Sequence, residues 1–148
     1  MIVPLTMAHA VHIVYRMREA DKLEVMASSR SEYLMDFARE CMFFGGYCVL
    51  AKDGEPVAMG GIAKQWGGVG NGWMVGTERL TSHMIEISKL IRRELSKPDW
   101  QRVQAWSHAG HKTAHVWLER LGFVNAHTLK RFGKKGEDFY LFELLKGE

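Results

Sequence analysis

The sequence predicts a mixed α/β fold in a single domain that spans residues 1–148, with about seven strands and four helices. Stretches rich in β-forming residues alternate with stretches whose apolar residues recur every three to four positions, which is the period of a helix. A hydrophobic content of 47% is enough for one core in a chain of 148 residues. No repeat, low-complexity tract or shift in composition marks a second domain.

The N-terminal third is predicted to contain one strand and two short helices. Residues 11–17 are rich in β-forming side chains and are expected to form the first strand. Apolar residues at helical spacing then continue to Cys41, interrupted by the polar residues 28–31. Within that break, Ser31 is the expected N-cap of the second helix.

A β-hairpin is predicted next. Residues 47–52 and 56–64 are expected to form antiparallel strands, because the Asp53-Gly54 pair between them is a strong signal for a tight turn.

A glycine-rich segment follows, with five glycines between residues 67 and 76. A phosphate-binding loop needs glycine at the mouth of a helix, where backbone N–H groups approach the anion. These glycines instead precede a predicted strand at residues 73–75, so residues 65–72 are expected to form a bend. The functional alternative is a mobile lip beside a groove, where Trp66 and Trp73 would contact a partner protein, although tryptophans in small domains are more often partly buried.

The C-terminal half is predicted to begin with a long helix that Thr77 caps and Pro98 ends. Gly122 is the expected C-terminal cap of a second helix. The remaining elements are expected in the order strand, helix, strand and strand, at residues 102–106, 111–121, 124–132 and 139–145.

Composition argues against several classes of function. Twenty Lys and Arg against 17 Asp and Glu give a net charge of +3, and the densest basic cluster, residues 130–135, fits a solvated hairpin better than a nucleic-acid site. No apolar run approaches the roughly 18 residues of a membrane span, and no secretion signal is evident. Cys41 and Cys48 are expected to be reduced thiols in a cytoplasm-like compartment.

The C-terminal half also resembles a known family. Residues 105–123, which end in Leu121-Gly122-Phe123, resemble the strand–loop–helix of GNAT acyltransferases, and the order of elements is similar over nearly the whole chain. Residues 17–21, 54–60 and 73–77 more particularly resemble the GNAT-like internal virion protein A family of short-tailed bacteriophages. That resemblance implies a virion-associated or assembly protein whose partners are other phage proteins, located in the host cytoplasm and the virion. A homo-oligomer of this chain is also possible under that resemblance.

The GNAT resemblance implies a sheet with a splayed middle, in which acetyl-CoA lies in the acyltransferases. In that family the long helix opens with Arg or Gln, then Gly three residues on and Gly or Ala five residues on, and their amides hold the pyrophosphate. Here Arg79 is followed by Ser82 and Met84 at the two small-residue positions, which predicts a degenerate cradle and no bound cofactor. If acetyl-CoA does bind, the resemblance implies contacts from Arg79, Leu80, Thr81, Ser82, His83 and His111, the last of which stands where the family usually has Asn.

The residues expected for catalysis also depart from the family. Leu118 stands where many GNAT enzymes carry a tyrosine acid, and it has no proton to give. The strand before the long helix supplies no carboxylate, which leaves Glu78, His108 or His83 as substitute bases if the protein is active. His108, His111 and His115 have a spacing that a metal ion could use, but no nearby Cys or carboxylate completes the site, so no metal is predicted.

Three hypotheses about function follow. The leading one is a non-catalytic, phage-encoded virion or assembly protein with a degenerate acyl-CoA groove. The alternative is an active acetyl-CoA-dependent N-acyltransferase, because proximity between a thioester and a deprotonated amine gives some catalysis without a dedicated acid. The third is an adaptor or inhibitor that binds a host protein through Trp66 and Trp73.

Overall fold

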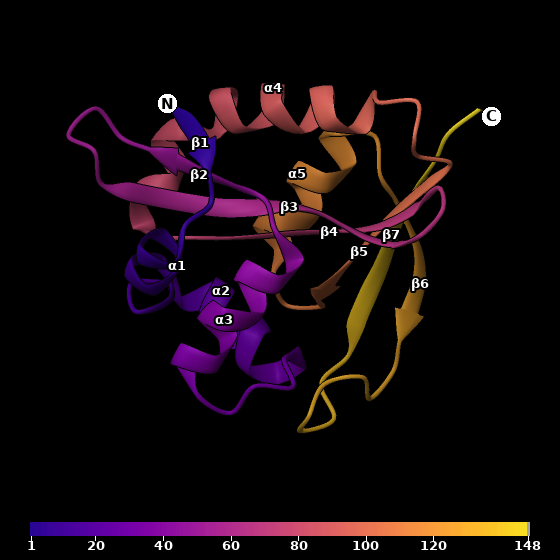
Figure 1. Cartoon of the computed structure of the whole chain (residues 1–148). Coiled ribbons are helices and arrows are strands. Elements are labelled where there is room, and N and C mark those ends of the chain that lie inside the picture. The colour runs from indigo at the N-terminus through magenta and orange to yellow at the C-terminus, as the bar shows by residue number, and fades with distance from the viewer. Residues whose placement is uncertain (148) are drawn as a thin grey trace.

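A seven-stranded mixed sheet runs through the molecule in the order β1-β2-β3-β4-β5-β7-β6 (Figure 1). The computed structural model describes residues 1–147. The strands are β1 (Ile2–Pro4), β2 (Tyr47–Leu50), β3 (Pro56–Trp66), β4 (Val69–Gly76), β5 (Arg102–His108), β6 (Val124–Leu129) and β7 (Phe139–Leu145). The helices are α1 (Met7–Val14), α2 (Glu19–Ser28), α3 (Leu34–Phe44), α4 (Met84–Leu95) and α5 (Lys112–Arg120), with a 3₁₀ helix η1 (Glu78–His83).

Helices cover both faces of this sheet. In Figure 1, α4 lies above the sheet, and α1, α2 and α3 lie below it. In this view α5 runs behind β3 and β4, and it is joined to α4 by the hydrogen bond from Trp117 Nε1 to Ser88 Oγ. Each face has its own apolar core: Ile13, Cys41 and Met59 belong to the cluster under α1 and α3, whereas Val103 and Phe142 belong to a cluster beside α4 and α5. The mixed α/β class and the seven strands are confirmed, and the described residues form five α-helices where about four were expected.

The sheet opens in its middle, between β4 and β5. These two strands are parallel and pair at three positions, from Val69↔Arg102 to Asn71↔Gln104. Beyond Asn71 the two strands continue to Gly76 and His108 without pairing with each other. The splay implied by the GNAT resemblance is therefore present, and peptide groups on the facing edges of both strands lack a strand partner there.

The prediction of a strand at residues 11–17 is wrong, because α1 occupies residues 7–14 and the first strand is the short β1. Thr6 and His9 form a reciprocal capping box: Thr6 Oγ1 accepts from the His9 N–H, and His9 Nδ1 accepts from the Thr6 N–H. Ala10 and Ile13 are spaced for one helical face and are fully buried. Capping and burial on that face outweigh the β propensity of the segment.

The expectation that Ser31 caps the next helix is also wrong. The N-cap of α3 is Tyr33, which makes no side-chain capping bond. The Ser31 hydroxyl instead donates to Glu40 Oε2 at 2.9 Å, and the Ser29 hydroxyl donates to the same oxygen at 3.2 Å. Both hydroxyls thus bind a carboxylate of α3 itself, and this charge-assisted pair fixes the segment that leads into the helix, with Ser31 two residues before the N-cap.

The prediction that residues 65–72 form a bend is wrong for most of that range, because the glycine-rich segment is mostly strand and β3 continues to Trp66. The turn is confined to Gly67 and Gly68, the latter at φ +82°, and β4 already begins at Val69. At Gly76 a Cβ atom would lie 2.8 Å from Leu80 Cδ2, so this glycine permits close packing of the following helix against the strand.

The hairpin and the C-terminal elements agree with expectation, but the start of the long helix does not. The Asp53-Gly54 turn joins antiparallel β2 and β3, and Gly122 at φ +102° follows α5. Thr77 accepts from the Arg79 N–H as a cap does, yet the first six residues form η1 and the α-helix starts at Met84. Every helix of residues 1–147 is too short or too polar to traverse a lipid bilayer.

Replacing Phe142, which is fully buried on β7, with alanine is expected to lower the free energy of unfolding by about 3–5 kcal/mol through loss of apolar contacts and formation of a cavity. The matched control is Phe43→Ala, because Phe43 is 91% exposed and its loss should change stability by less than about 0.5 kcal/mol. Urea unfolding followed by circular dichroism measures both. Equal effects of the two substitutions would contradict the position of the core.

Candidate functional site

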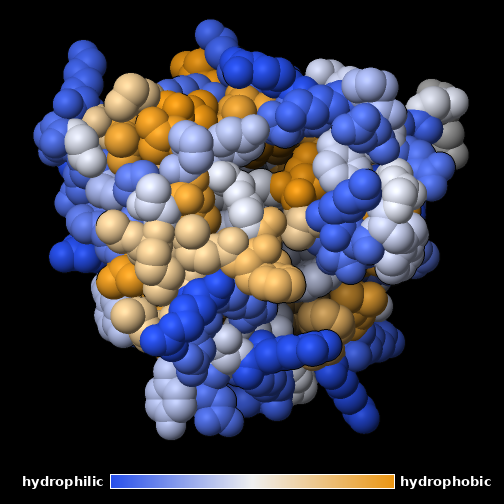
Figure 2. All heavy atoms as spheres, viewed as in Figure 1, coloured by the Kyte–Doolittle hydropathy of each residue, from blue (hydrophilic) through white to orange (hydrophobic). Residues whose placement is uncertain are grey.

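A cavity of about 290 Å³ lies where β4 and β5 separate. This volume is close to the lower limit of about 300 Å³ for small-molecule sites. Gly72 and Met74 line the cavity from β4, Ala105 and Ser107 line it from β5, and side chains of α2, α4 and α5 complete the wall. Figure 2 shows that one face of the molecule is hollowed below the position of α4 and that hydrophobic side chains gather around the hollow.

The β4 side of the cavity is left open by a small residue. A Cβ atom on Gly72 would meet its nearest neighbours at 3.9 Å, which is ordinary contact, so space remains beyond it. Asn71, the last residue of β4 that pairs with β5, has a buried Oδ1 atom with no hydrogen-bond partner among the described residues. Asn71 does not line the cavity, so this unpartnered acceptor is not presented to a ligand there.

A buried ionic cluster closes one end of the cavity, centred on Asp21 of α2. Asp21 is 4% exposed and its carboxylate accepts four hydrogen bonds. Arg18 Nη2 donates at 2.9 Å and Arg18 Nε at 3.2 Å, the Gly76 N–H donates at 2.8 Å, and His111 Nε2 lies 3.1 Å away. This carboxylate therefore joins α2 to the end of β4 and to the residue that precedes α5.

The hydrogen bonds keep Asp21 ionised. Burial by itself would raise the pKa of Asp21, but the bonds from His111 and Arg18 outweigh it and the pKa lies below its ordinary value of 3.8. At neutral pH this buried carboxylate is a negative charge and a pure acceptor.

Glu24 is a second acid in the same cluster, one helical turn beyond Asp21, and its pKa is shifted in the opposite direction. Its Oε2 atom accepts from the Ser107 hydroxyl and from the His108 N–H, each at 3.0 Å. Burial raises the pKa of Glu24, and the nearby Asp21 carboxylate adds to that increase. Glu24 lines the cavity, and a cavity carboxylate with a raised pKa suits a general base.

None of the residues expected as bases lines the cavity. Glu78 is exposed on η1. The ring of His108 packs edge-on against Phe139, with centroids 5.4 Å apart, and its Nδ1 accepts from the Gly110 N–H. Their catalytic roles stay predictions.

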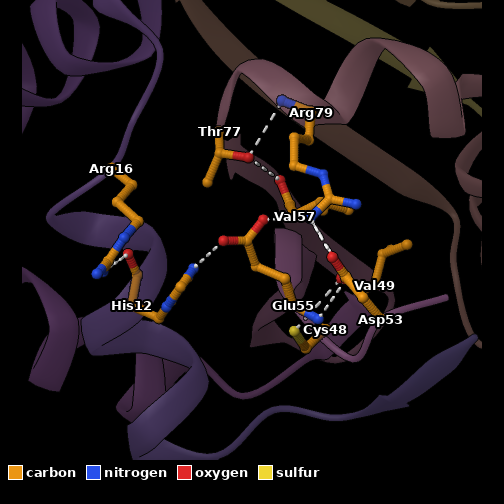
Figure 3. A network of polar contacts seen from close by, with 9 residues as sticks. All are labelled: His12, Arg16, Cys48, Val49, Asp53, Glu55, Val57, Thr77 and Arg79. Carbon is orange, nitrogen blue, oxygen red and sulfur yellow. Dashed lines mark hydrogen bonds and ion pairs between the residues drawn. The ribbon is translucent and has the colours of Figure 1, made fainter. Parts of the chain in front are cut away.

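Arg79, the first of the expected cofactor contacts, is held by the β2–β3 turn. Its Nη1 lies 3.0 Å from Asp53 Oδ2 and also pairs with Glu55 (Figure 3). Figure 3 also shows His12 of α1 directed at Glu55, with His12 Nε2 and the carboxylate 3.5 Å apart. An anionic ligand at Arg79 would have to compete with these two carboxylates.

The other expected contacts are divided between the cavity and the surface. Leu80, Thr81 and His111 line the cavity. Ser82 turns its hydroxyl back onto the Arg79 carbonyl, and His83 Nδ1 lies 3.5 Å from Glu86. Whether any of the six contacts a cofactor remains a prediction. Met84 packs against the apolar cluster that includes Leu80, as its bulk suggested.

The two tryptophans proposed as partner contacts lie in different environments. Trp66 is 67% exposed at the end of β3. Trp73 packs edge-on against Phe44 at 5.8 Å and lines the cavity, and its buried Nε1 has no hydrogen-bond partner among the described residues. They do not form one contact surface.

Cysteine and metal chemistry receive no support from the described part of the chain. Burial raises the pKa of Cys41 to about 12 and that of Cys48 to about 11, so both stay protonated and weakly nucleophilic. Within residues 1–147, no three His, Cys, Asp or Glu side chains are grouped as metal ligands.

Three residues of the cluster, Arg18, Asp21 and Glu24, were not predicted from the sequence as site residues. One signal was available: the segment 18–24 carries an Arg–Asp pair three residues apart and a second acid three residues later, on a helix face that also contains the buried Val25. Acids on a buried helix face need buried partners. Those partners, on β4, on β5 and at the residue before α5, are 55 to 90 residues away in the sequence, so no local pattern identifies them.

Solved acetyltransferases share this fold. A GNAT-family acetyltransferase from Bacillus anthracis superposes with a TM-score of 0.71 at 14% identity, covering 99% of this chain and 95% of that one. A ribosomal-protein-S5-alanine acetyltransferase from Vibrio fischeri gives 0.71 at 13%, covering 99% and 93%. A variant of the spermidine N-acetyltransferase from Vibrio cholerae gives 0.70 at 9%, covering 98% and 92%.

These similarities define the class of this protein as GNAT-fold. Sequence identities of 9–14% show the fold alone and do not identify a substrate for this chain. No protein-family model and no curated protein matches the sequence.

Replacing Glu24 with glutamine is expected to change how stability depends on pH. The pKa of Glu24 is above its ordinary value of 4.5 in the folded state, so the unfolded chain releases this proton first as the pH rises. The stability contributed by protonated Glu24 is therefore complete below about pH 4.5 and is lost as the pH rises through the folded pKa. Glu24→Gln keeps an acceptor for Ser107 but cannot ionise, so its stability relative to wild type should increase over that range.

Urea unfolding at a series of pH values measures this difference. The control is Glu32→Gln, because Glu32 is exposed and lies outside the cluster. A stability difference between Glu24→Gln and wild type that stays constant with pH would show that Glu24 does not carry the raised pKa.

Proposed function

We propose that this protein is an acetyl-CoA-dependent N-acyltransferase that binds the thioester arm between β4 and β5. The observation that carries the proposal is the cavity itself, which lies in the splay, offers unpaired strand edges and ends at a buried acid–base cluster. The fold neighbours described as N-acetyltransferases support this reaction class.

The residues present fit the acyl arm of this substrate. An amide-containing chain can add to a strand edge through main-chain hydrogen bonds, and β4 beyond Asn71 offers such an edge. Gly72 leaves room for the arm, and the apolar side chains of Met74 and Ala105 line its path.

Transfer of an acetyl group forms a bond from an amine nitrogen to the carbonyl carbon and breaks the carbon–sulfur bond. The amine must first lose its proton, which requires a nearby base. The cavity places Glu24 and the His111–Asp21 pair at that end, whereas the sequence offered Glu78 and His108.

The ion pairs of Arg79 do not exclude binding of phosphates. Arg79, Asp53 and Glu55 are all at or near the surface, where salt bridges are weak. A diphosphate carries more charge than either carboxylate and can exchange with them at little cost.

A second function is favoured by the start of the long helix. At residues 78–84, where the acyltransferases have small residues whose amides hold the pyrophosphate, this chain has the 3₁₀ helix η1 and a Met84 that packs into the core. These features support a groove that no longer holds acyl-CoA. Together with the sequence resemblance to internal virion protein A, they make a phage virion or assembly protein, present in the host cytoplasm and the virion, the second candidate.

Filling the cavity is expected to separate the two functions. Gly72→Leu places a side chain in the space between the strands and should weaken acetyl-CoA binding at least about tenfold, or about 1.4 kcal/mol, in isothermal titration calorimetry. Gly67→Leu is the matched control, because a Cβ atom on this turn residue meets nothing within 4 Å. If wild-type protein gives no binding heat at high micromolar acetyl-CoA, the acyltransferase function is wrong.

The virion function predicts a different result. The protein should co-purify with phage particles, and mass spectrometry of purified particles should detect its peptides. Particles that lack the protein, produced by cells that contain it, would rule out a virion component.

A further inference from the structure

Thr113 faces the cavity next to the buried ionic cluster. It lies in the first turn of α5, is exposed and lines the cavity. Its Oγ1 atom is 3.3 Å from His111 Nδ1, and the other ring nitrogen of His111 is 3.1 Å from Asp21 Oδ1. A hydroxyl, an imidazole and a carboxylate thus stand in a row that leads from the cavity to the interior.

Asp21 determines which nitrogen of His111 carries the proton. Hydrogen bonds lower the pKa of Asp21, so this carboxylate is ionised and can only accept. His111 Nε2 must then be the protonated nitrogen. In the neutral ring, Nδ1 keeps its lone pair and accepts the hydrogen of the Thr113 hydroxyl.

The ring and its carboxylate are held in place. His111 is 7% exposed, and Asp21 is fixed by Arg18 and by the Gly76 N–H. A proton that reaches Nδ1 forms an imidazolium whose Nε2–H remains bonded to the carboxylate, and this charge pair is favourable in a poorly solvated site.

We propose that Thr113 and His111 form a proton relay for acyl transfer, with Asp21 as the positioning residue. The relay rests on the acyltransferase function proposed above. When the amine attacks the thioester, its proton passes to Thr113 Oγ1 as the Thr113 hydroxyl proton passes to His111 Nδ1. As the carbon–sulfur bond breaks, the proton returns from Nδ1 through Thr113 to the sulfur, so the products are an amide and a free thiol.

The relay can serve this chain as both base and acid. Leu118 cannot act as an acid, and the β4 strand supplies no carboxylate base. One hydroxyl that first accepts and later donates a proton performs both tasks. Glu24 is less suited to them, because its Oε2 atom already accepts from the Ser107 hydroxyl and the His108 N–H.

The surrounding charges are compatible with a transient imidazolium at His111. Two carboxyl groups of α2, those of Asp21 and Glu24, face the His111 ring and favour a positive charge on it when they are ionised. Arg18 is paired with Asp21, while His108 and His115 approach from β5 and α5. Burial lowers the pKa of His115, which keeps that ring neutral beside the relay.

The test compares Thr113→Val, which removes the hydroxyl and keeps the shape, with Thr113→Ser, which keeps the hydroxyl. Release of free thiol from acetyl-CoA is measured with benzylamine and other small primary amines. Thr113→Val should lower kcat about 10²-fold and leave the KM for acetyl-CoA unchanged, and Thr113→Ser should stay close to the wild-type rate. A Thr113→Val rate equal to that of wild type would overturn the relay.

A second measurement judges the relay even if wild-type protein transfers no acetyl group, which would count against the acyltransferase function. Nitrogen-15 NMR of histidine-labelled protein reports the tautomer of His111. The relay requires an Nε2–H tautomer in wild type and an Nδ1 resonance that shifts in Thr113→Val but not in Thr113→Ser. An Nδ1–H tautomer in the neutral ring, or an Nδ1 resonance that does not respond to Thr113→Val, overturns the relay.

Discussion

The carboxylate of Asp21 is the interaction on which the rest of the site depends. It accepts from Arg18 of its own helix, from the last residue of β4 and from His111 at the start of α5. A lone buried charge is expensive, and removing one partner of a buried pair leaves the other uncompensated. The three elements around the splay are therefore fixed relative to one another by the requirement that this charge be neutralised.

That constraint explains how a sheet can open at its centre and stay ordered. Beyond Asn71, β4 and β5 lose the hydrogen bonds that would hold them together. Two carboxylates of α2 replace those bonds at the far end: Asp21 binds the Gly76 N–H of β4, and Glu24 binds Ser107 and the His108 N–H of β5. One helix thereby bridges the two separated strands, and the cavity lies between the bridge and the point of separation.

The two proposed functions use different parts of this frame. An acyltransferase needs the cavity and the acid–base groups at its end, whereas a virion protein needs only a stable domain with a surface for its partners. In the proposed acyltransferase the diphosphate would lie near Arg79, which pairs here with the turn residues Asp53 and Glu55. These exposed ion pairs are weak enough to be replaced by a diphosphate and also sufficient to hold the turn without one.

Local sequence determined much of the fold. Asp53-Gly54 identified its hairpin, Thr77 its cap and Gly122 its helix end, because each depends on a few adjacent residues. The same local reasoning failed at residues 11–17, where the β-forming side chains of a helix face were mistaken for a strand. Tertiary structure alone decided the site, since Asp21, Gly76 and His111 meet across 90 residues of sequence and their mutual neutralisation leaves no periodic signal. Sequence therefore specified which segments could be helix or strand, and packing decided which charges came together, because burial of a charge is settled only by the partners that the completed fold supplies.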